Sequence, residues 1–288
     1  MVAGSDQRTI LPNSPVRFGC FHTPRGMAVL LLRLVLLVGW AAILSGTSAA
    51  QASGSKVPVL VELFTSEGCS SCPPADDLLA RLDSLQPISG AQLVVLSEHV
   101  DYWNHDGWVD PFSSASTTER QASYEHVLNL KTPYTPQFVV DGTAELQAND
   151  SRKVLATLQQ AGSTPKIALR ILSASVTSAN PLVIQGRTES PSNLEKHKVD
   201  VFVAVALDHA ESQVARGENS GRHLSHVAVL TDLAKIGKLE PGKSFAQDFH
   251  VKLKLPPTPA KTIRLVVFIQ ESGPGRVLGA AEEKLPLN

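Results

Sequence analysis

The stretch that most constrains the fold of this chain is residues 57–85, where two cysteines separate a strand pattern from a helix pattern. Residues 57–66 form a continuous apolar run, which is typical of a strand covered on both faces. Residues 73–85 carry leucines at helical spacing. Cys69 and Cys72 are therefore predicted to lie at a helix N-terminus, where unpaired backbone N–H groups and the helix dipole stabilise an anion.

The spacing of these cysteines predicts thiol–disulfide exchange. Cys69 is expected to be the exposed nucleophile, because a helix N-terminus lowers the pKa of a thiol. Cys72 is expected to lie behind it and to resolve a mixed disulfide formed at Cys69. One alternative is a structural disulfide, although closing so short a loop stabilises little. A zinc site made from the pair and His99 is another, but the sequence has no second C-x-x-C and no H-x-x-x-H pattern.

The rest of the first half alternates strand and helix patterns. Residues 91–100 predict a second buried strand, and a capping box at Ser116 opens a second helix. Residues 137–148 predict two short strands joined by a turn, and Asp150 can cap a last helix. The predicted α/β domain, residues 53–162, therefore has the order β-α-β-α-β-β-α and a mixed sheet.

The pattern changes after the segment 162–165. From Lys166 onward, alternating or apolar runs are separated by Pro, Gly, Asn and Ser turns. Such a pattern is typical of an all-β domain. We expect residues 163–288 to form a sandwich-like β domain, with the linker at 162–165.

The N-terminal region, residues 1–52, predicts export. An apolar stretch that starts at Met27 ends in small residues up to Ala52, which fits the A-x-A cleavage pattern of a secretory signal. Met27 is an alternative start of translation, because the segment before it is long for a signal. An uncleaved membrane anchor is the other interpretation, since residues 27–44 approach the length that a bilayer requires. In both cases the remaining chain is expected in the periplasm or outside the cell, where its two cysteines can oxidise.

The charge pattern argues against a nucleic-acid partner. The chain has a net charge of -1, and its 26 Lys and Arg residues are scattered along the sequence rather than clustered. A surface that follows a phosphate backbone needs a concentrated basic field. The composition therefore favours a globular protein whose partners are not nucleic acids.

Three further residues are candidates for proton handling near the cysteines. Glu62 is a carboxyl group within the first buried strand, where ionisation is costly, so it is either a proton relay for Cys72 or a carboxyl paired with a local donor. His99 and Asp101 follow the second strand, and parallel neighbours end at the same sheet edge as the C-x-x-C. They are either an acid–base pair for the thiols or hydrogen-bonded residues at a strand end.

A polar cluster in the second half, "RGENSGRHLSH" at residues 216–226, has no role assigned by its composition. Gly217 and Gly221 indicate tight turns. A binding site and a charged loop between strands or domains both fit this segment.

The motif "KTPYTPQFVV" adds a resemblance to the thioredoxin superfamily over residues 57–162. In that superfamily a proline before the third core strand is cis and packs against the C-x-x-C, which implies this role for Thr135 and Pro136. The combination of "VELFTSEGCSSCPPAD", "HVDYW", "GWVDPF", "YTPQFVVDG" and "RGENSGRHLSH" resembles domain-of-unknown-function family 1223, a bacterial secreted family. This resemblance implies a thioredoxin-like half, a β-rich half and export, but no activity.

These observations predict an exported thiol–disulfide oxidoreductase that acts on protein or small-molecule thiols and disulfides. No metal or organic cofactor is implied. The alternative from another class is a non-catalytic secreted adaptor, in which Cys69 and Cys72 form a stable structural disulfide.

Overall fold

The computed structural model describes residues 56–105, 107–177, 183–190, 199–252 and 260–287, together with Gly19. The chain divides after Ser53, and the fold described below belongs to the unit from Gly54 to Asn288. The predicted export signal at residues 1–52 lies outside the described residues, apart from Gly19. No helix within the described ranges is long and apolar enough to span a membrane.

The first half has the predicted order of helices and strands. β1 pairs in parallel with β2 and antiparallel with β3, and β3 pairs antiparallel with β4, so this part of the sheet is mixed. The elements are β1 (Val57–Thr65), α2 (Pro73–Leu85), β2 (Ala91–His99), α3 (Ala115–Leu128), β3 (Gln137–Val140), β4 (Ala144–Gln147) and α4 (Ser151–Gly162).

The N-cap residues predicted for α3 and α4 can be compared with the structure. Asp150 caps α4, since its carboxylate accepts a hydrogen bond of 3.0 Å from the backbone N–H of Lys153. For α3 the predicted cap at Ser116 is wrong. Ser114 is the N-cap, because its hydroxyl accepts from the N–H of Thr117 and its backbone is extended.

The second half consists of strands within its described ranges, as predicted. Two of them are long and form a hairpin that extends past the rest of the sheet, β7 and β8. The elements are β5 (Arg170–Thr177), β6 (Val183–Ser190), β7 (Val199–Gln213), β8 (His223–Leu239), β9 (Phe245–Lys252), β10 (Thr262–Glu271) and β11 (Val277–Pro286).

The arrangement of these strands differs from the predicted separate sandwich. Four of them join the strands of the first half in one eight-stranded sheet of order β11-β10-β7-β8-β2-β1-β3-β4, and β5, β6 and β9 form a second, antiparallel sheet. The join is the pairing of β2 with β8 at Ser97 and Val229. Without β8, the edge of β2 would expose unpaired N–H and C=O groups, which is unfavourable. The two predicted domains therefore share a sheet.

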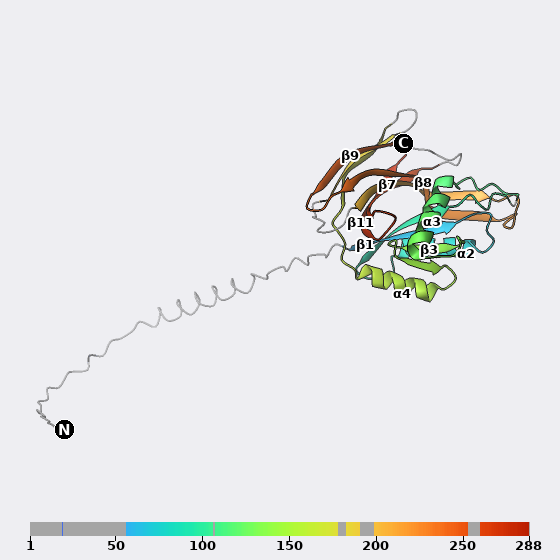
Figure 1. Ribbon diagram of the computed structural model, residues 1–288, viewed down its shortest axis with the longest axis horizontal. Helices are drawn as coiled ribbons and strands as arrows, with labels where there is room; N and C mark the ends of the chain where they lie inside the picture. The colour runs from blue at the N-terminus through green and yellow to red at the C-terminus, as the bar shows by residue number, and fades with distance from the viewer. Residues whose placement is uncertain are drawn as a thin grey trace, which may run out of the picture. The chain divides into compact units, whose positions relative to one another are not determined.

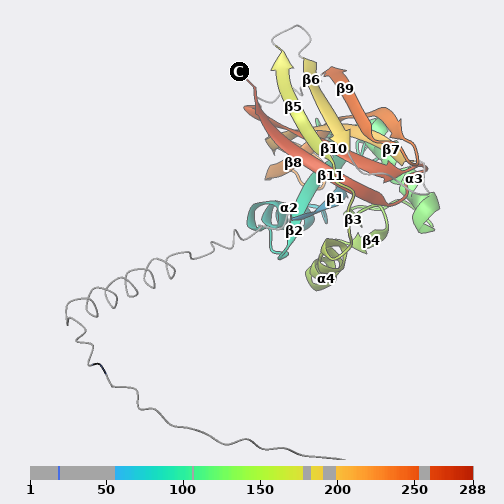
Figure 2. The same ribbon diagram turned by 90° about the vertical axis from the view of Figure 1, so that its left-hand side faces the viewer.

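The two halves of the large sheet pack against each other through a shared apolar cluster. A single apolar cluster contains Leu60 and Val94 from the first half together with Ala204 and Phe268 from the second. α2 and α4 cover the other face of the first half, and the sheet β5-β6-β9 covers the other face of the second half. Figures 1 and 2 show these layers from two directions.

Candidate functional site

Cys69 and Cys72 form a disulfide at the start of α2. Their Cα atoms are 5.4 Å apart, Cys72 is the N-cap residue, and Pro73 is the first residue of the helix. Cys72 is buried, as expected. The expected exposure of Cys69 is wrong, because only 1% of this residue is exposed. Ser70 and Ser71, between the two cysteines, are the exposed part of the motif.

The cover over Cys69 comes from the loop between β7 and β8, residues 214–222. Asn219 is buried, and its side-chain amide donates hydrogen bonds to the carbonyl oxygens of Glu67 at 2.8 Å and Cys69 at 2.9 Å. The carboxylate of Glu218 accepts a hydrogen bond of 3.0 Å from the N–H of Ser70. These contacts hold the β7–β8 loop against the backbone of the cysteine motif. The sequence singled out this polar segment but gave no sign that it would lie against the cysteines, 150 residues away.

A buried carboxyl group, Glu67, lies at the centre of the polar contacts next to the disulfide. Trp108 donates a hydrogen bond of 2.8 Å from its indole N–H to Oε2 of Glu67. The Oε1 atom accepts from the hydroxyl of Ser212 and lies 3.2 Å from Nε2 of His226. Glu67 is fully buried, so these contacts replace the water that an exposed carboxylate would bind. Two of its partners come from the β7–β8 hairpin.

His99 lies beside this group, as predicted from its position at the end of β2. Its Nδ1 atom is 2.7 Å from Oδ2 of Asp110, and its ring packs edge-on against the ring of His226 at 4.6 Å between centroids. Burial alone would lower the pKa of His99, but the charge of Asp110, the hydrogen bond with Asp110 and the charge of Glu67 together outweigh burial and raise this pKa. Burial would raise the pKa of Asp110, but His99 and two backbone N–H donors lower it overall. Both shifts favour the charged forms, an imidazolium at His99 and a carboxylate at Asp110.

Asp101, the other predicted residue at this strand end, has a different environment. Its carboxylate accepts a hydrogen bond of 2.6 Å from the hydroxyl of Thr118, and its N–H donates to the same hydroxyl oxygen. These contacts tie the end of β2 to α3. They match the strand-end interpretation rather than a contact with the thiols.

Asp76 was not predicted, although it is the carboxyl group that follows Cys72 by one helical turn. Its N–H donates to the carbonyl oxygen of Cys72 at 3.1 Å, and its side chain is buried. Burial raises the pKa of Asp76 to about 7, although nearby His226 opposes this shift. The i, i+4 spacing of Cys72 and Asp76 was a usable signal, because it places both residues on one helix face.

Glu62 lies on the other side of the sheet from α2. Val61 and Leu63, its neighbours in β1, belong to the apolar cluster beneath α2, so the alternation of the strand directs Glu62 to the opposite face. There its carboxyl group accepts hydrogen bonds from Arg120 Nε at 2.5 Å and from the hydroxyl of Tyr124 at 2.6 Å. Of the two interpretations of Glu62, this geometry matches the carboxyl that is paired with local donors.

A second buried carboxyl, Glu98, shares this cluster with Glu62. Its Oε1 atom lies 3.6 Å from Nε of Arg120. Burial first, and then the charge of Glu62, raise the pKa of Glu98 well above its usual value. One guanidinium therefore faces two carboxyl groups, which favours a shared proton between them.

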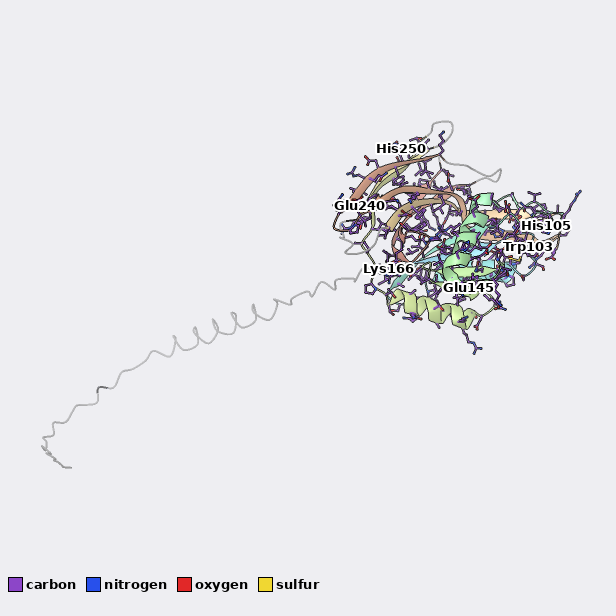
Figure 3. All side chains as sticks on the ribbon, in the orientation of Figure 1. Trp103, His105, Glu145, Lys166, Glu240 and His250 are labelled. Carbon is purple, nitrogen blue, oxygen red and sulfur yellow. A yellow bond between two sulfur atoms is a disulfide. The ribbon has the colours of Figure 1, made fainter. Side chains whose placement is uncertain are left out.

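The Thr135–Pro136 peptide bond is cis, as predicted. Both residues line a pocket of about 410 Å³ that also includes Ser71 and Ala75, so Pro136 lies beside the C-x-x-C motif. The indole N–H of Trp103 donates to the hydroxyl of Thr135 at 2.8 Å. Trp103 belongs to the loop after β2, which also carries His105; both residues are labelled in Figure 3.

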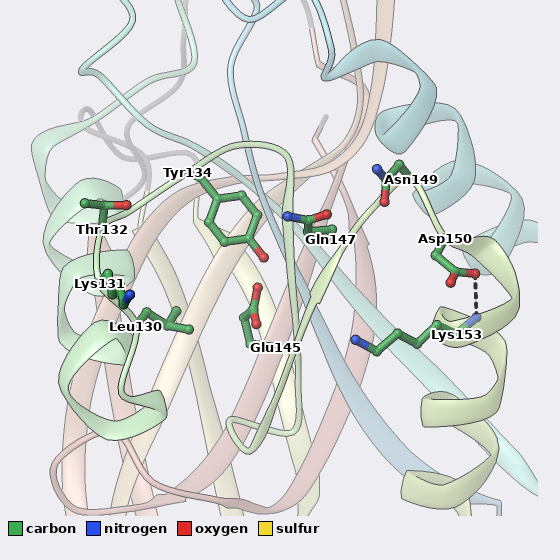
Figure 4. A pocket seen from close by; sticks show the side chains of 9 residues that line it. All are labelled: Leu130, Lys131, Thr132, Tyr134, Glu145, Gln147, Asn149, Asp150 and Lys153. Carbon is green, nitrogen blue, oxygen red and sulfur yellow. Dashed lines mark hydrogen bonds between the residues drawn. The ribbon is translucent and has the colours of Figure 1, made fainter.

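A second pocket, of about 510 Å³, continues from the first one towards α4 and shares Tyr134, Gln147 and Asn149 with it. Tyr134 and Glu145 point towards each other across this pocket, and Lys153 extends into it from α4 (Figure 4). Ser71 therefore opens onto a groove that continues along β4.

Gly68 allows the loop after β2 to pack against the cysteine loop. A Cβ atom at Gly68 would lie 2.9 Å from Cβ of Trp103 and 3.2 Å from its carbonyl oxygen, so only glycine fits at this approach. Gly217 and Gly221, in the loop above Cys69, have φ values of 77° and 80° and make the predicted turns. Within the described ranges, no group of three or more His, Cys, Asp or Glu side chains is arranged to hold a metal ion.

The motifs at this site, from β1 through the β7–β8 loop, lie within the range that a family model matches. The model of the "Protein of unknown function (DUF1223)" family covers residues 60–270. The chain belongs to this family. The match confirms the resemblance that the sequence motifs indicated, and it spans both halves of the large sheet.

Two solved structures have a fold similar to that of this family member. One is the X-ray crystal structure of protein AGR_C_4864 from Agrobacterium tumefaciens, with 26% identity and a TM-score of 0.56; the match covers 79% of this chain and 94% of that one. The other is HBP35 of Porphyromonas gingivalis, with 12% identity and a TM-score of 0.58; it covers 80% of this chain and 76% of that one. A search of curated proteins finds no match.

Proposed function

We propose that this protein is an exported thiol–disulfide oxidoreductase, with Cys69 as the nucleophile and Cys72 as the resolving thiol. The observation that carries this proposal is the disulfide at the N-terminus of α2, with the buried carboxyl of Asp76 one turn away. A helix N-terminus favours a thiolate, and a nearby carboxyl group can exchange a proton with the second thiol. Residues 57–162 would then be a thioredoxin-like domain, which the element order and the cis Thr135–Pro136 bond support.

The proposed reaction proceeds in two steps with a substrate disulfide. The Cys69 thiolate attacks one substrate sulfur, the substrate S–S bond breaks, and the first substrate thiolate leaves. Cys72 then gives its proton to Asp76 and attacks Sγ of Cys69, which releases the second substrate thiolate and forms the Cys69–Cys72 disulfide. The substrate is reduced by two electrons and the cysteine pair is oxidised by two. A substrate dithiol would drive the same steps in reverse.

The adaptor remains a second candidate, and the burial of both cysteines favours it. A disulfide that is covered by Asn219 and only 1% exposed at Cys69 resembles a structural bond more than an open redox site. In this case the groove next to Ser71 would bind a partner without a chemical reaction. The two functions differ in their redox potential, because structural disulfides typically have potentials below about -300 mV.

Trapping of mixed disulfides separates the two candidates. Cys72→Ser should accumulate mixed disulfides with substrate proteins and with glutathione, because Cys69 can attack but nothing resolves the product. Cys69→Ser should trap none, and both variants should lose insulin-reductase activity. If both variants behave alike, or if a potential below about -300 mV is measured for the pair, the adaptor is the correct function.

Export is tested separately from the chemistry. Mass spectrometry of the protein from cells should show a mature chain that begins close to Ala52. A mature species that retains residues 27–50 would instead favour a membrane anchor.

A further inference from the structure

His226 connects the second half of the protein to the cysteine site through two carboxyl groups. It belongs to β8, and 2% of the residue is exposed. Its Nε2 atom lies 3.2 Å from Oε1 of Glu67, in the loop before the cysteines. Its Nδ1 atom lies 3.9 Å from Oδ2 of Asp76, in the helix after them. Each ring nitrogen therefore faces a different carboxyl group.

Among the described residues, His226 and Asp76 each carry a polar atom without a hydrogen-bond partner. On His226 it is Nδ1, which faces Asp76, and on Asp76 it is Oδ1, the other oxygen of the carboxyl group whose Oδ2 atom faces His226. Buried polar atoms are rarely left without a partner in folded proteins, and exceptions often mark functional sites. The gap between His226 and Asp76 is too long for a hydrogen bond but short enough for strong electrostatic coupling.

The other charged groups around His226 are also titratable. The ring of His99 packs against it, Asp110 holds His99, and Asp77 influences Asp76 from the same helix. His99, Asp110 and Asp76 are buried together with His226, so a proton on one of these groups changes the proton affinity of the others.

We propose that His226 is a positioning residue of the redox site, whose ring lies between Glu67 and Asp76 and keeps Asp76 ready to accept the proton of Cys72. The idea rests on the proposed exchange reaction. The charge of His226 lowers the pKa of Asp76 and so favours the carboxylate form, which is the form that can accept a proton. When Cys72 transfers its proton to Asp76, the carboxyl becomes neutral, and the contact between His226 and Glu67 holds the ring in place. The β half of the protein would thus supply part of the redox site.

The test is a pH titration of Asp76 in the full protein with the disulfide intact. NMR measures the chemical shift of the Asp76 carboxyl carbon at each pH, and the midpoint of the change is the quantity compared. His226→Gln keeps a polar side chain but removes the charge, so the midpoint of Asp76 should rise by about one pH unit. His223→Gln is the matched control, because this histidine lies on the same strand and is exposed. Its variant should leave the midpoint unchanged. An unchanged midpoint in a folded His226→Gln protein would overturn the proposal, since a merely space-filling histidine predicts that result.

Two further measurements cover the other outcomes. If His226→Gln does not fold, the wild-type protein decides: the Asp76 carboxyl carbon and the His226 ring nitrogens should show the same pair of midpoints, and independent single midpoints would overturn the coupling. The pH dependence of the equilibrium between the cysteine pair and dithiothreitol should also change in His226→Gln but not in His223→Gln. This equilibrium can be measured for a structural disulfide too. Failure of the trapping experiment therefore removes the exchange function without deciding the coupling, which the NMR titration tests separately.

Discussion

The side-chain amide of Asn219 donates a hydrogen bond of 2.9 Å to the carbonyl oxygen of Cys69, and these residues are 150 positions apart in the chain. The same amide holds the carbonyl oxygen of Glu67. One side chain from the β7–β8 loop therefore fixes the backbone that precedes the disulfide.

Replacing Asn219 tests whether this contact limits access to the disulfide. Asn219→Ala leaves two buried carbonyl groups without their donor, which should destabilise the protein by about 1–3 kcal/mol. If the loop opens, reduction of the disulfide by dithiothreitol should become several-fold faster. Ser220→Ala is the control, because Ser220 is exposed and bonds only within its own loop. Equal reduction rates in both variants would show that Asn219 has no role in access.

The second prediction separates Asp76 from Glu62 as the proton acceptor. Asp76→Asn should remove the titration near pH 7 from the pH dependence of the redox equilibrium, because burial places the pKa of Asp76 there. Glu62→Gln should leave this dependence unchanged, since Glu62 lies on the other face of the sheet. The measurement is equilibration with dithiothreitol at pH values from 5 to 9. If the pH dependence changed in Glu62→Gln but not in Asp76→Asn, Glu62 would be the proton relay that the sequence suggested.

The third prediction concerns how the ionisation of the buried Asp76 side chain changes the stability of the protein with pH. Its folded pKa of about 7 lies above the usual value of 3.8, so the folded state holds a proton that the unfolded state has lost between these pH values. Stability from this group is complete below about pH 4 and is lost as the pH rises to 7. Asp76→Asn should therefore gain melting temperature relative to the wild type at pH 8 but not at pH 4. If the melting temperature of Asp76→Asn instead fell below that of the wild type, and fell further at pH 8 than at pH 4, the predicted direction would be wrong.

The fourth prediction concerns the cluster of Arg120 with Glu62 and Glu98. Arg120→Met would leave two buried carboxyl groups without their cation, which should destabilise the protein by about 3–5 kcal/mol. Arg187→Met is the matched control. Its ion pair with Asp248 is exposed on both sides, so its loss should cost less than about 1 kcal/mol. Denaturant unfolding of both variants measures the difference, and equal costs would mean that the buried cluster contributes no more than a surface pair.

Local patterns in the sequence predicted the local structure well. The apolar run before Cys69, the leucines after Cys72 and the cap at Asp150 each depend on neighbours within a few positions, and the structure contains all three elements. The cis bond before Pro136 followed from the resemblance to a known superfamily. At Ser114 the prediction missed by two residues, since two serines with similar capping ability stand close together.

Long-range contacts were beyond these patterns. The pairing of β8 with β2 uses a single register pair, which leaves no periodic signal in either strand. The contact of the β7–β8 loop with Cys69 could not be predicted either. The composition of a polar loop is the same whether the loop faces water or packs against a cysteine. The direction of Glu62 was predictable in principle. The alternation along β1 places Glu62 on the face opposite Val61 and Leu63. Because both faces of this strand are otherwise apolar, the sequence does not show which face packs against which helix.

The shared sheet also restricts how this protein can be cut into parts. A fragment that ends after α4 would lose β8 from the edge of β2 and would expose Leu60 and Val94, which now pack against the second half. Such a fragment should aggregate, because an uncovered strand edge and an apolar face both promote association. Recombination that exchanges the first half alone between relatives would meet the same obstacle, so the two halves of this chain are expected to be inherited together.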